Sequence, residues 1–464
     1  MNIFGKVSGF ALALAALSLT GCDDDGGSNG AGGAGGAGGA GGAGGGADAG
    51  VDGCPAGTTE EGDICVLQGE ITEDLTLTAD KTWLLRGGVF IGNDTDRTVL
   101  TVEPGTTVFG ETATKGMLVV RRGSQIQANG TAAAPIVFTS PNLEGSRARG
   151  DWGGVIINGR APVNGCATAP CEAEGEGGTG LYGGNDPEDS SGTLRYVRVE
   201  YAGILLSEDN ELNGIAFQGV GRGTVIDFIQ VHMNKDDGIE FFGGTAQAKH
   251  LLLTGIGDDC LDWTDGWQGK AQFVAAVQFE DAGDQGIEAD NNGENNDASP
   301  RSKPTLSNVT LLGGGAENSD LGILLREGTA GELHNVIVTR FGEACFTLDH
   351  NATFGNAGTA GMLSGELLIS NSILWCPDSA DFLEPELDMA PPFTVEAFIG
   401  LNDNVQVVNP QITDATGRDL RPAAGSPALG AGVTPSDAFF DSVDYIGAFG
   451  SDDWTAGWTN WAVN

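Results

Sequence analysis

A short acidic motif recurs three times near the middle of the chain, as DDGIE at 236–240, DDCLD at 258–262 and DQGIE at 284–288. The steps between the copies are 22 and 26 residues. A repeat length in the low twenties corresponds to one turn of a parallel β-helix, in which three short strands and their turns form one rung. The framework of a leucine-rich repeat, which has a similar period, is absent from the sequence. The motif therefore predicts a solenoid of stacked β-strands.

A second repeat lies further along the chain, as SNVTL at 307–311, HNVIV at 334–338 and SNSIL at 370–374. If these segments also stack, their asparagines form a ladder of side-chain amides along one turn of the solenoid. From about residue 66 onward, short β-rich runs are interrupted by Gly, Asn and Asp, and helical periodicity is missing. We therefore expect an all-β chain.

Length and charge narrow the possibilities further. The chain has 464 residues, whereas a single compact core rarely exceeds roughly 250–300 residues. The fold therefore has several domains or grows along one axis. The 22 Lys and Arg residues stand against 64 Asp and Glu residues, a formal net charge of −42. Nucleic-acid binding needs clustered Lys and Arg, so we expect no nucleic-acid partner, and cations, sugars or high salt are favoured instead.

The N-terminus has the features of an exported precursor. Lys6 precedes an apolar run at 10–17, which is too short to span a bilayer and is typical of a signal peptide. The sequence LTGC at 19–22 resembles the bacterial lipobox and implies lipidation of Cys22; the alternative is a soluble secreted protein. Fifteen of the 25 residues at 26–50 are glycine, which predicts a flexible tether. The expected partner is a lipid bilayer, and the expected location is the cell envelope, at the outer membrane or cell surface.

Seven cysteines follow Cys22. Two pairs bracket short loops and are natural local disulfides in an exported protein: Cys54 with Cys65, and Cys166 with Cys171. The first pair falls in residues 51–82, which we expect to form a small N-terminal cap. The pairing of three others stays open, and at least one of their thiols is expected to be free and buried: Cys260, Cys345 and Cys376. A zinc site is disfavoured because CxxC pairs are absent and the four histidines are scattered.

The acidic repeats predict two columns of carboxylates, because equivalent residues of stacked rungs lie about 4.8 Å apart. Strand alternation points one column outward: Glu240, Asp262 and Glu288. A second column lies at the turn: Asp236, Asp258 and Asp284. Like charges on neighbouring strands destabilise a sheet, so these columns need a cation, raised pKa values or strong exposure to solvent. Ca²⁺, which takes about 6–8 oxygen ligands, is the cation that suits them, and the alternative is a solvated acidic face. We expect no organic cofactor.

Aromatic side chains lie beside these acids in the sequence. An aromatic face next to carboxylates is a common platform for a sugar ring. A ligand-binding site is therefore predicted from two aromatic and three acidic residues: Phe242, Trp267, Glu240, Asp262 and Glu288. The alternative is that the aromatic rings fill the core, which strand alternation favours for Phe241 and Trp263.

Four segments resemble a family of bacterial envelope lipoproteins with a pectin-lyase-like β-helix: 100–107, 150–157, 236–244 and 444–449. The resemblance implies a right-handed parallel β-helix, to which we add projecting loops and a Trp-rich C-terminal cap over the last rung, since that rung otherwise leaves an unpaired strand edge. Members of the family mostly lack an assigned function. The expected domains are a signal peptide (1–21), a lipidated cysteine and tether (22–50), an N-terminal cap (51–82), a parallel β-helix (83–410) and a C-terminal cap (411–464).

A weaker resemblance concerns catalysis. Asp237, followed 21 residues later by Asp258 and Asp259, is similar to the aspartate motifs of polygalacturonase-type glycoside hydrolases. That resemblance implies that Asp259 is the general acid and that Asp237 and Asp258 activate water. The family's Gly-His-Gly is missing, and its Arg-Ile-Lys is at best echoed by Arg326. A calcium-dependent lyase with Arg326 or Lys235 as the base is a further alternative.

Taken together, these patterns predict a lipid-anchored envelope protein whose function is surface binding or adhesion, without catalysis. The expected ligand is a polysaccharide or another surface molecule, and calcium is expected in the acidic columns. The alternative is a polysaccharide-degrading enzyme, either a hydrolase or a lyase.

Overall fold

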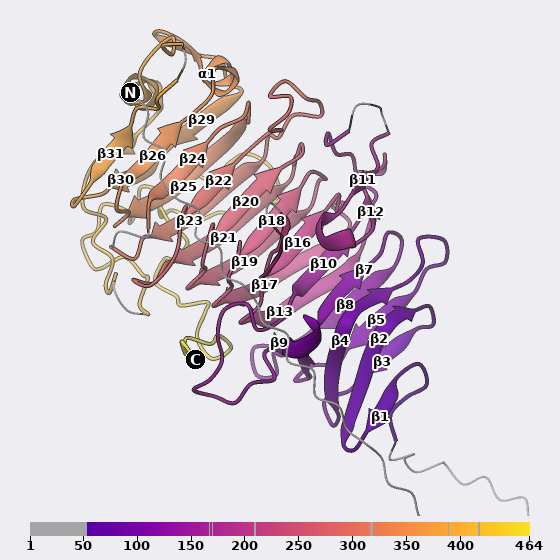
Figure 1. Cartoon of the computed structure of the whole chain (residues 1–464). Helices are drawn as coiled ribbons and strands as arrows, with labels where there is room; N and C mark the ends of the chain where they lie inside the picture. Colours follow the sequence, from indigo (N-terminus) through magenta and orange to yellow (C-terminus); the bar gives the residue numbers. More distant parts are fainter. Residues whose placement is uncertain are drawn as a thin grey trace, which may run out of the picture. The chain divides into compact units, whose positions relative to one another are not determined.

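The acidic repeats lie on consecutive strands of one large sheet in the computed structural model of the chain (Figure 1). The structure describes residues 53–464, except 167, 169, 208–209, 316–318, 388 and 416–417. The predicted signal peptide, Cys22 and the tether lie outside the described residues. Within the described part, 26 strands share the sheet, and its ladders are parallel except where β1 (Thr59–Glu61) meets β2 (Ile64–Ile71). The predicted right-handed parallel β-helix is confirmed.

The strands form successive rungs. One face, which carries the acidic repeats, contains short strands: β7 (Met117–Val120), β10 (Gly154–Asn158), β16 (Ile215–Gln218), β18 (Ile239–Phe242), β20 (Leu261–Thr264), β22 (Ile287–Ala289), β24 (Leu321–Leu325), β26 (Ala344–Leu348) and β31 (Ala380–Leu383). Long bent strands complete the middle rungs: β13 (Gly192–Glu200), β17 (Val225–His232), β19 (Gln247–Thr254), β21 (Lys270–Val277), β23 (Thr305–Leu312) and β25 (Gly331–Thr339). The end rungs use further strands: β3 (Leu75–Leu77), β4 (Thr82–Ile91), β5 (Val99–Val102), β6 (Thr107–Gly110), β8 (Gln125–Asn129), β9 (Ile136–Thr139), β29 (Leu367–Ser370), β30 (Ser372–Trp375) and β32 (Val405–Gln406).

Smaller elements project from the rungs. Three two-stranded hairpins stand apart from the large sheet in the described residues: β11 (Ala173–Glu174) with β12 (Leu181–Tyr182), β14 (Ile204–Ser207) with β15 (Asn210–Leu212), and β27 (Gly358–Thr359) with β28 (Met362–Leu363). The helical segments are short: α1 (Asn351–Ala357), α2 (Val395–Leu401), and the 3-10 turns η1 (Thr112–Thr114) and η2 (Glu176–Gly178). Two of these elements, η2 and β15, reach the acidic face.

Each long strand bends at one residue with positive φ, and these residues stack from rung to rung: Tyr196, Phe228, His250, Phe273, Asn308 and Asn335. Positive φ is unfavourable for bulky residues and tolerated by asparagine. Ring stacking offsets this cost, since the centroids of Phe228 and His250 lie 4.1 Å apart. Asn308 and Asn335 stack in register as predicted, but their amides donate to Tyr445 O and Val433 O. The amides of Asn308 and Asn335 thus contact the C-terminal segment instead of each other, while Asn371, the third predicted member, accepts from Asn404 Nδ2 at 3.2 Å.

The inside of the β-helix is apolar. The central residues of the acidic repeats, Ile239, Leu261 and Ile287, are fully buried, which confirms their predicted inward direction. Burial of each such side chain stabilises the fold by roughly 1.5–3 kcal/mol. Alternate residues of a strand face opposite sides of the sheet. Because these three residues point inward, the acidic residue that follows each of them points outward.

The two ends of the β-helix are closed by different means. At the N-terminal end, β1 pairs antiparallel with β2, and β2 is already in parallel register with β4. The rungs therefore begin inside the predicted cap. At the C-terminal end, α2 places Phe398 against Phe346, with ring centroids 6.1 Å apart, and buries Val395 and Ile399. An apolar helix thus covers the last part of the core.

The C-terminal segment, residues 411–464, lies along the long bent strands (Figure 1). Asn308 donates to Tyr445 O at 2.9 Å, and Gln230 donates to Asn460 O at 2.6 Å. The prediction that this segment covers the last rung is therefore wrong. The physical reason is that outward amides on the long strands can satisfy an irregular backbone, whereas an open apolar core end needs an apolar cover.

Both predicted disulfides, Cys54–Cys65 and Cys166–Cys171, are present. A third, Cys345–Cys376, joins β26 to the residue after β30. Cys260 is the free cysteine among the described residues, and it is buried. This confirms the expectation of a free buried thiol and settles the pairing that the sequence left open.

Candidate functional site

The outward carboxylates form the predicted column. Glu240 on β18 is paired with Asp262 on β20, which is paired with Glu288 on β22. The same outward position holds Ala216 on the preceding strand of this face and Leu324 on the following one. Acidic side chains therefore occupy three successive rungs of a column that is apolar on either side. Such a local change of chemistry on a regular scaffold marks a candidate site.

The turn before these strands carries the second predicted column. The backbone N–H of Asp284 donates to Asp258 O at 3.1 Å, which places the two residues on adjacent rungs. The neighbouring carboxylates interlock as well. Asp237 Oδ1 accepts from the N–H of Asp259 at 3.1 Å, and Asp259 Oδ1 accepts from the N–H of Gln285 at 2.6 Å. Each carboxylate is thereby held by the backbone of the next rung.

These acids converge on a cavity of about 240 Å³, the acidic pocket. Its lining is almost entirely acidic: Glu176, Glu211, Asn213, Asp236, Asp237, Glu240, Asp258, Asp259, Asp262 and Glu288. In the described residues, four sets of three have carboxylate oxygens within 4.8 Å of one another: Glu211–Asp236–Asp258, Asp237–Glu240–Asp262, Asp237–Asp258–Asp259 and Asp259–Asp262–Glu288. Of the residues predicted as metal ligands, only Asp284 lies outside this lining.

Burial gives the acidic pocket unusual electrostatics. It raises the pKa values of Asp237, Glu240, Asp259 and Asp262 far above the ordinary range of a carboxyl group, and neighbouring carboxylates add to the effect. Burial likewise raises the pKa of Asp236 to about 8 and that of Glu176 to about 7. At neutral pH the pocket therefore needs protons or a cation to balance its charge.

A positively charged side chain, that of Arg326, lies at the Glu288 end of the outward column. Arg326 forms ion pairs with Glu288 and with Asp290, and its Nε lies 2.9 Å from Asp290 Oδ1. Burial lowers the pKa of Arg326, but the hydrogen bonds and negative charges of these acids raise it above its ordinary value. In this structure Arg326 is therefore the counter-ion of Glu288 and Asp290.

The centre of the acidic pocket keeps an unbalanced oxygen. Asp262 is 8% exposed, and within the described part of the chain its Oδ1 has no hydrogen-bond partner. By contrast, Glu240 Oε2 accepts from Asn213 Nδ2 at 2.6 Å. A buried carboxylate oxygen without a donor is costly, and a proton, a water molecule or a cation would balance it.

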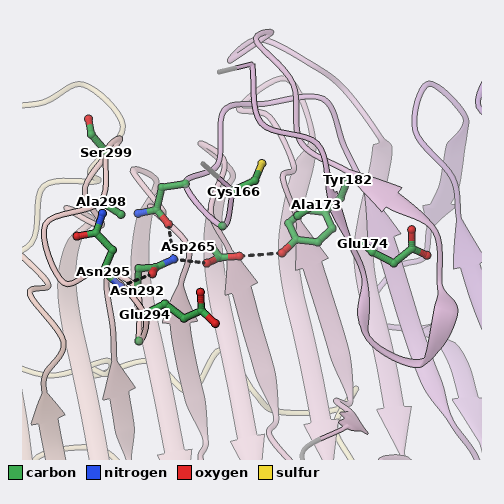
Figure 2. A pocket seen from close by; sticks show the side chains of 13 residues that line it. Cys166, Ala173, Glu174, Tyr182, Asp265, Asn292, Glu294, Asn295, Ala298 and Ser299 are labelled. Atoms are coloured by element: carbon green, nitrogen blue, oxygen red, sulfur yellow. Dashed lines mark hydrogen bonds between the residues drawn. The ribbon is translucent and has the colours of Figure 1, made fainter. Parts of the chain in front are cut away.

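A larger cavity, the amide pocket, has a volume of about 920 Å³. Figure 2 shows Asp265 at its centre, where Oδ2 accepts from the hydroxyl of Tyr182 at 2.8 Å and Oδ1 accepts from Asn292 Nδ2 at 3.3 Å. The loop at 291–300 forms one wall. The lining is polar on most sides: Asn164, Gly165, Cys166, Ala173, Glu174, Tyr182, Asp265, Asn292, Gly293, Glu294, Asn295, Ala298 and Ser299.

A family model described as a pectate-lyase-like β-helix domain matches residues 69–385. The chain belongs to this family. Membership in the pectate-lyase-like β-helix family indicates a carbohydrate-related protein. No curated protein and no solved structure has a significant match to the chain.

The predicted aromatic platform of this pectate-lyase-like β-helix is wrong. Trp267 is 0% exposed and stacks on Phe241 inside the core, with ring centroids 4.2 Å apart. Phe242 is also buried, under the edge of Tyr182. Trp267 follows the end of β20, where the turn directs its side chain back into the core, and the overlying β12 covers Phe242. Neither ring can contact a sugar in this structure.

The acids of the hydrolase hypothesis do meet in the acidic pocket of this pectate-lyase-like β-helix. Oxygens of Asp237, Asp258 and Asp259 lie within 4.8 Å of one another. Inverting glycosidases keep their two carboxyl groups roughly 6.5–9.5 Å apart so that a water molecule fits between them. The nearest oxygens of the three acids are closer together than that separation of carboxyl groups, and such oxygens are near enough to share one cation.

Two acids of the pocket were not predicted. Glu176 lies in η2, and Glu211 lies in β15, both in insertions outside the repeating rungs. The sequence repeat predicts how successive rungs align. It does not predict where an insertion between two rungs packs against them. The acid-rich composition of the loop around Glu176 was the one signal available.

Proposed function

We propose that this protein is a non-catalytic carbohydrate-binding protein of the cell envelope and that Ca²⁺ occupies its acidic pocket. The observation that carries the calcium proposal is the buried Asp262 carboxylate, whose Oδ1 lacks a donor at the centre of overlapping acidic groups. The lipid anchor at Cys22, the bilayer as partner and a location at the outer membrane or cell surface are parts of the same proposal. A surface polysaccharide is the proposed ligand.

Calcium fits this donor set better than other common ions. It accepts about 6–8 oxygen ligands at roughly 2.3–2.6 Å, with tolerant geometry. Two oxygens on one such ion therefore lie within about 5 Å of each other, and the spacing within Asp237, Glu240 and Asp262 meets this limit. Zinc favours nitrogen and sulfur ligands, and magnesium keeps several waters in a strict octahedron. An all-carboxylate cluster supports calcium.

Calorimetric titration with Ca²⁺ and thermal unfolding with and without a chelator test the metal site. We expect binding heat for the full-length protein and a higher unfolding midpoint with Ca²⁺. Asp262→Asn should weaken Ca²⁺ binding by at least about tenfold, because it removes a charged ligand. In chelator the same variant should unfold at a higher midpoint than the wild type, because it removes one charge from a crowded buried set.

Asp378→Asn is the matched control, since Asp378 is exposed in a turn away from the pocket. It should change neither the binding heat nor the midpoints. A midpoint that does not respond to the chelator, together with no binding heat, would refute the calcium site.

The second candidate function is glycoside hydrolysis, favoured by the convergence of Asp237, Asp258 and Asp259. Asp259→Asn distinguishes the two functions. Under the hydrolase alternative it abolishes the release of reducing ends from polygalacturonate and related glycans. Under our proposal the wild type already releases none, and the variant changes calcium affinity alone.

A further inference from the structure

The amide pocket lies outside the acidic pocket, and its walls are held from several directions. Asn164 is 5% exposed, and its Nδ2 donates to Asn291 Oδ1 at 2.9 Å and to Pro300 O at 2.8 Å. Tyr182 is 4% exposed and anchors Asp265 from the opposite wall (Figure 2). The hydrogen bonds of two buried polar side chains thus fix the cavity before any ligand enters.

Carboxylates supply the strongest hydrogen-bond acceptors in the lining of the amide pocket. A carboxylate offers about four acceptor positions, and the side chains of Asn292 and Tyr182 use two of those on Asp265. Glu174 and Glu294 flank the Tyr182–Asp265 pair from opposite sides in Figure 2, and among the described residues neither has a hydrogen-bond or ion-pair partner. The cavity therefore offers carboxylate acceptors beside the amide and hydroxyl groups of Asn295 and Ser299, which can both donate and accept hydrogen bonds.

The charge of the lining restricts that ligand. Three carboxylates line the amide pocket, and no lysine or arginine is among the described residues that line it. An anionic sugar such as a uronate would meet like charge in a partly desolvated cavity and would be rejected. Sugar hydroxyl groups, which donate hydrogen bonds without carrying charge, complement such a lining.

A metal ion is the competing occupant, and the spacing argues against it. Asp265, Glu174 and Glu294 belong to none of the sets of described residues whose oxygens lie within 4.8 Å. The volume of about 920 Å³ also differs from the 240 Å³ of the acidic pocket. It falls in the range of roughly 300–1,000 Å³ that is usual for organic ligands.

From these observations we propose that the amide pocket binds an uncharged oligosaccharide, with Asp265 and Glu294 accepting hydrogen bonds from its hydroxyl groups. This inference rests on the proposed carbohydrate-binding function and specifies its ligand class and its location. It separates the two cavities by role: the acidic pocket holds a cation, and the amide pocket holds the sugar.

Ligand-observed NMR titration of the full-length protein tests the proposal. The probes are neutral galacto-, gluco- and manno-oligosaccharides of two to four units, oligogalacturonides of the same lengths, and chitosan oligomers as a cationic series. We expect at least one neutral series to bind and the oligogalacturonides to bind at least about tenfold more weakly. Glu294→Gln and Asp265→Asn should each weaken the neutral sugar about tenfold, the usual effect of losing a hydrogen bond to a charged group.

Two controls keep the outcome interpretable. Glu294 is exposed, so Glu294→Gln cannot act through misfolding of the core, and Glu73→Gln, at an exposed position on the first rungs, should leave binding unchanged. Preference for oligogalacturonides or for the cationic series alone, or neutral-sugar binding that both pocket variants leave intact, would overturn the inference. If neutral sugars bind equally well to both pocket variants, the protein still binds carbohydrate, but not in the amide pocket. If no sugar of any charge binds, the proposed carbohydrate-binding function is refuted as well. Ca²⁺ binding to the acidic pocket is measured separately by calorimetric titration, and Glu294→Gln should leave it unchanged.

Discussion

At the scale of single residues, the acidic face depends on how each carboxylate is balanced. Asp237 and Asp259 each accept a backbone N–H, Glu240 accepts the amide of Asn213, and Glu288 pairs with Arg326. Asp262, in the middle of the column, has no comparable partner for its Oδ1 in the described residues. Arg326 thus balances the charge of the column at its Glu288 end, and Ca²⁺ is the cation that we propose for its centre.

Arg326→Met tests the counter-ion at the edge. It leaves Glu288 and Asp290 without their guanidinium partner, and loss of one partner of a buried pair costs about 3–5 kcal/mol. Because the Arg326 side chain is 32% exposed, solvent screening reduces the expected loss to about 1–3 kcal/mol of unfolding free energy. Urea denaturation in the presence of chelator measures it.

Lys303→Met is the control for this change. Lys303 pairs with Glu366 at the surface, with side-chain exposures of 34% and 56%, and such pairs contribute about 0–1 kcal/mol. Equal losses for the two variants would contradict the role given to Arg326.

At the scale of the strand and the rung, the repeat determines the columns. Burial of Ile239, Leu261 and Ile287 forces the following residue outward, so a pattern visible in the sequence places Glu240, Asp262 and Glu288 in line. The same reasoning could not locate residues on insertions. Glu176, Glu211 and the amide-pocket residues Asn164 and Tyr182 meet the rungs through irregular loops whose path depends on tertiary packing.

The wrong prediction for the aromatic residues has a similar origin. Alternation holds along a strand, but Trp267 follows the end of β20, where the turn directs its side chain into the core. Phe242 does point outward from β18, yet the hairpin strand β12 covers it. Periodicity predicts the direction of a side chain within a strand, and it does not predict what packs over it.

The column as a unit should make metal-free stability fall as pH rises. A carboxyl group with a raised pKa in the folded state holds its proton more tightly when the protein is folded. The stabilisation is therefore complete below the pKa of the unfolded state, near 4, and it is lost as the pH rises past the pKa of the folded state. Those values are about 6 for Asp284, 7 for Glu176 and 8 for Asp236. In chelator, the unfolding midpoint should drop on the order of 5 °C between pH 5 and pH 8.

Calcium should remove most of this drop, because it replaces the protons as the balancing charge. Asp236→Asn isolates the contribution of the pocket from that of histidines elsewhere, and it should flatten the pH dependence in chelator. A metal-free midpoint that rises steadily from pH 5 to pH 8 in the wild type, with no change in slope in the variant, would contradict this account.

At the scale of the whole described unit, the C-terminal segment covers the long bent strands while the acidic face stays clear. Trp458 is fully buried against Tyr196 and Phe228, with ring centroids 5.6 Å and 6.2 Å away. The segment thus shields the stacked rings that the positive-φ bends create. The proposed calcium site and this aromatic packing therefore lie on different faces of the same β-helix.

Trp458→Ala should therefore cost stability without affecting the calcium site. Removal of a fully buried tryptophan is expected to lower the unfolding free energy by about 3–5 kcal/mol, measured by urea denaturation. Trp461→Ala, at a half-buried position of the same segment, should cost less than half as much. Calcium affinity should be the same in both variants, and a loss of affinity in Trp458→Ala would argue that the two faces are coupled.

The most direct test of the cation site is a crystal structure of the protein grown with Ca²⁺, with anomalous data collected at a wavelength where calcium scatters. We predict an anomalous peak in the acidic pocket, with oxygens of Asp237, Glu240 and Asp262 at about 2.3–2.6 Å from it. A map with no anomalous signal between these three carboxylates, at a calcium concentration that saturates binding in solution, would contradict the prediction.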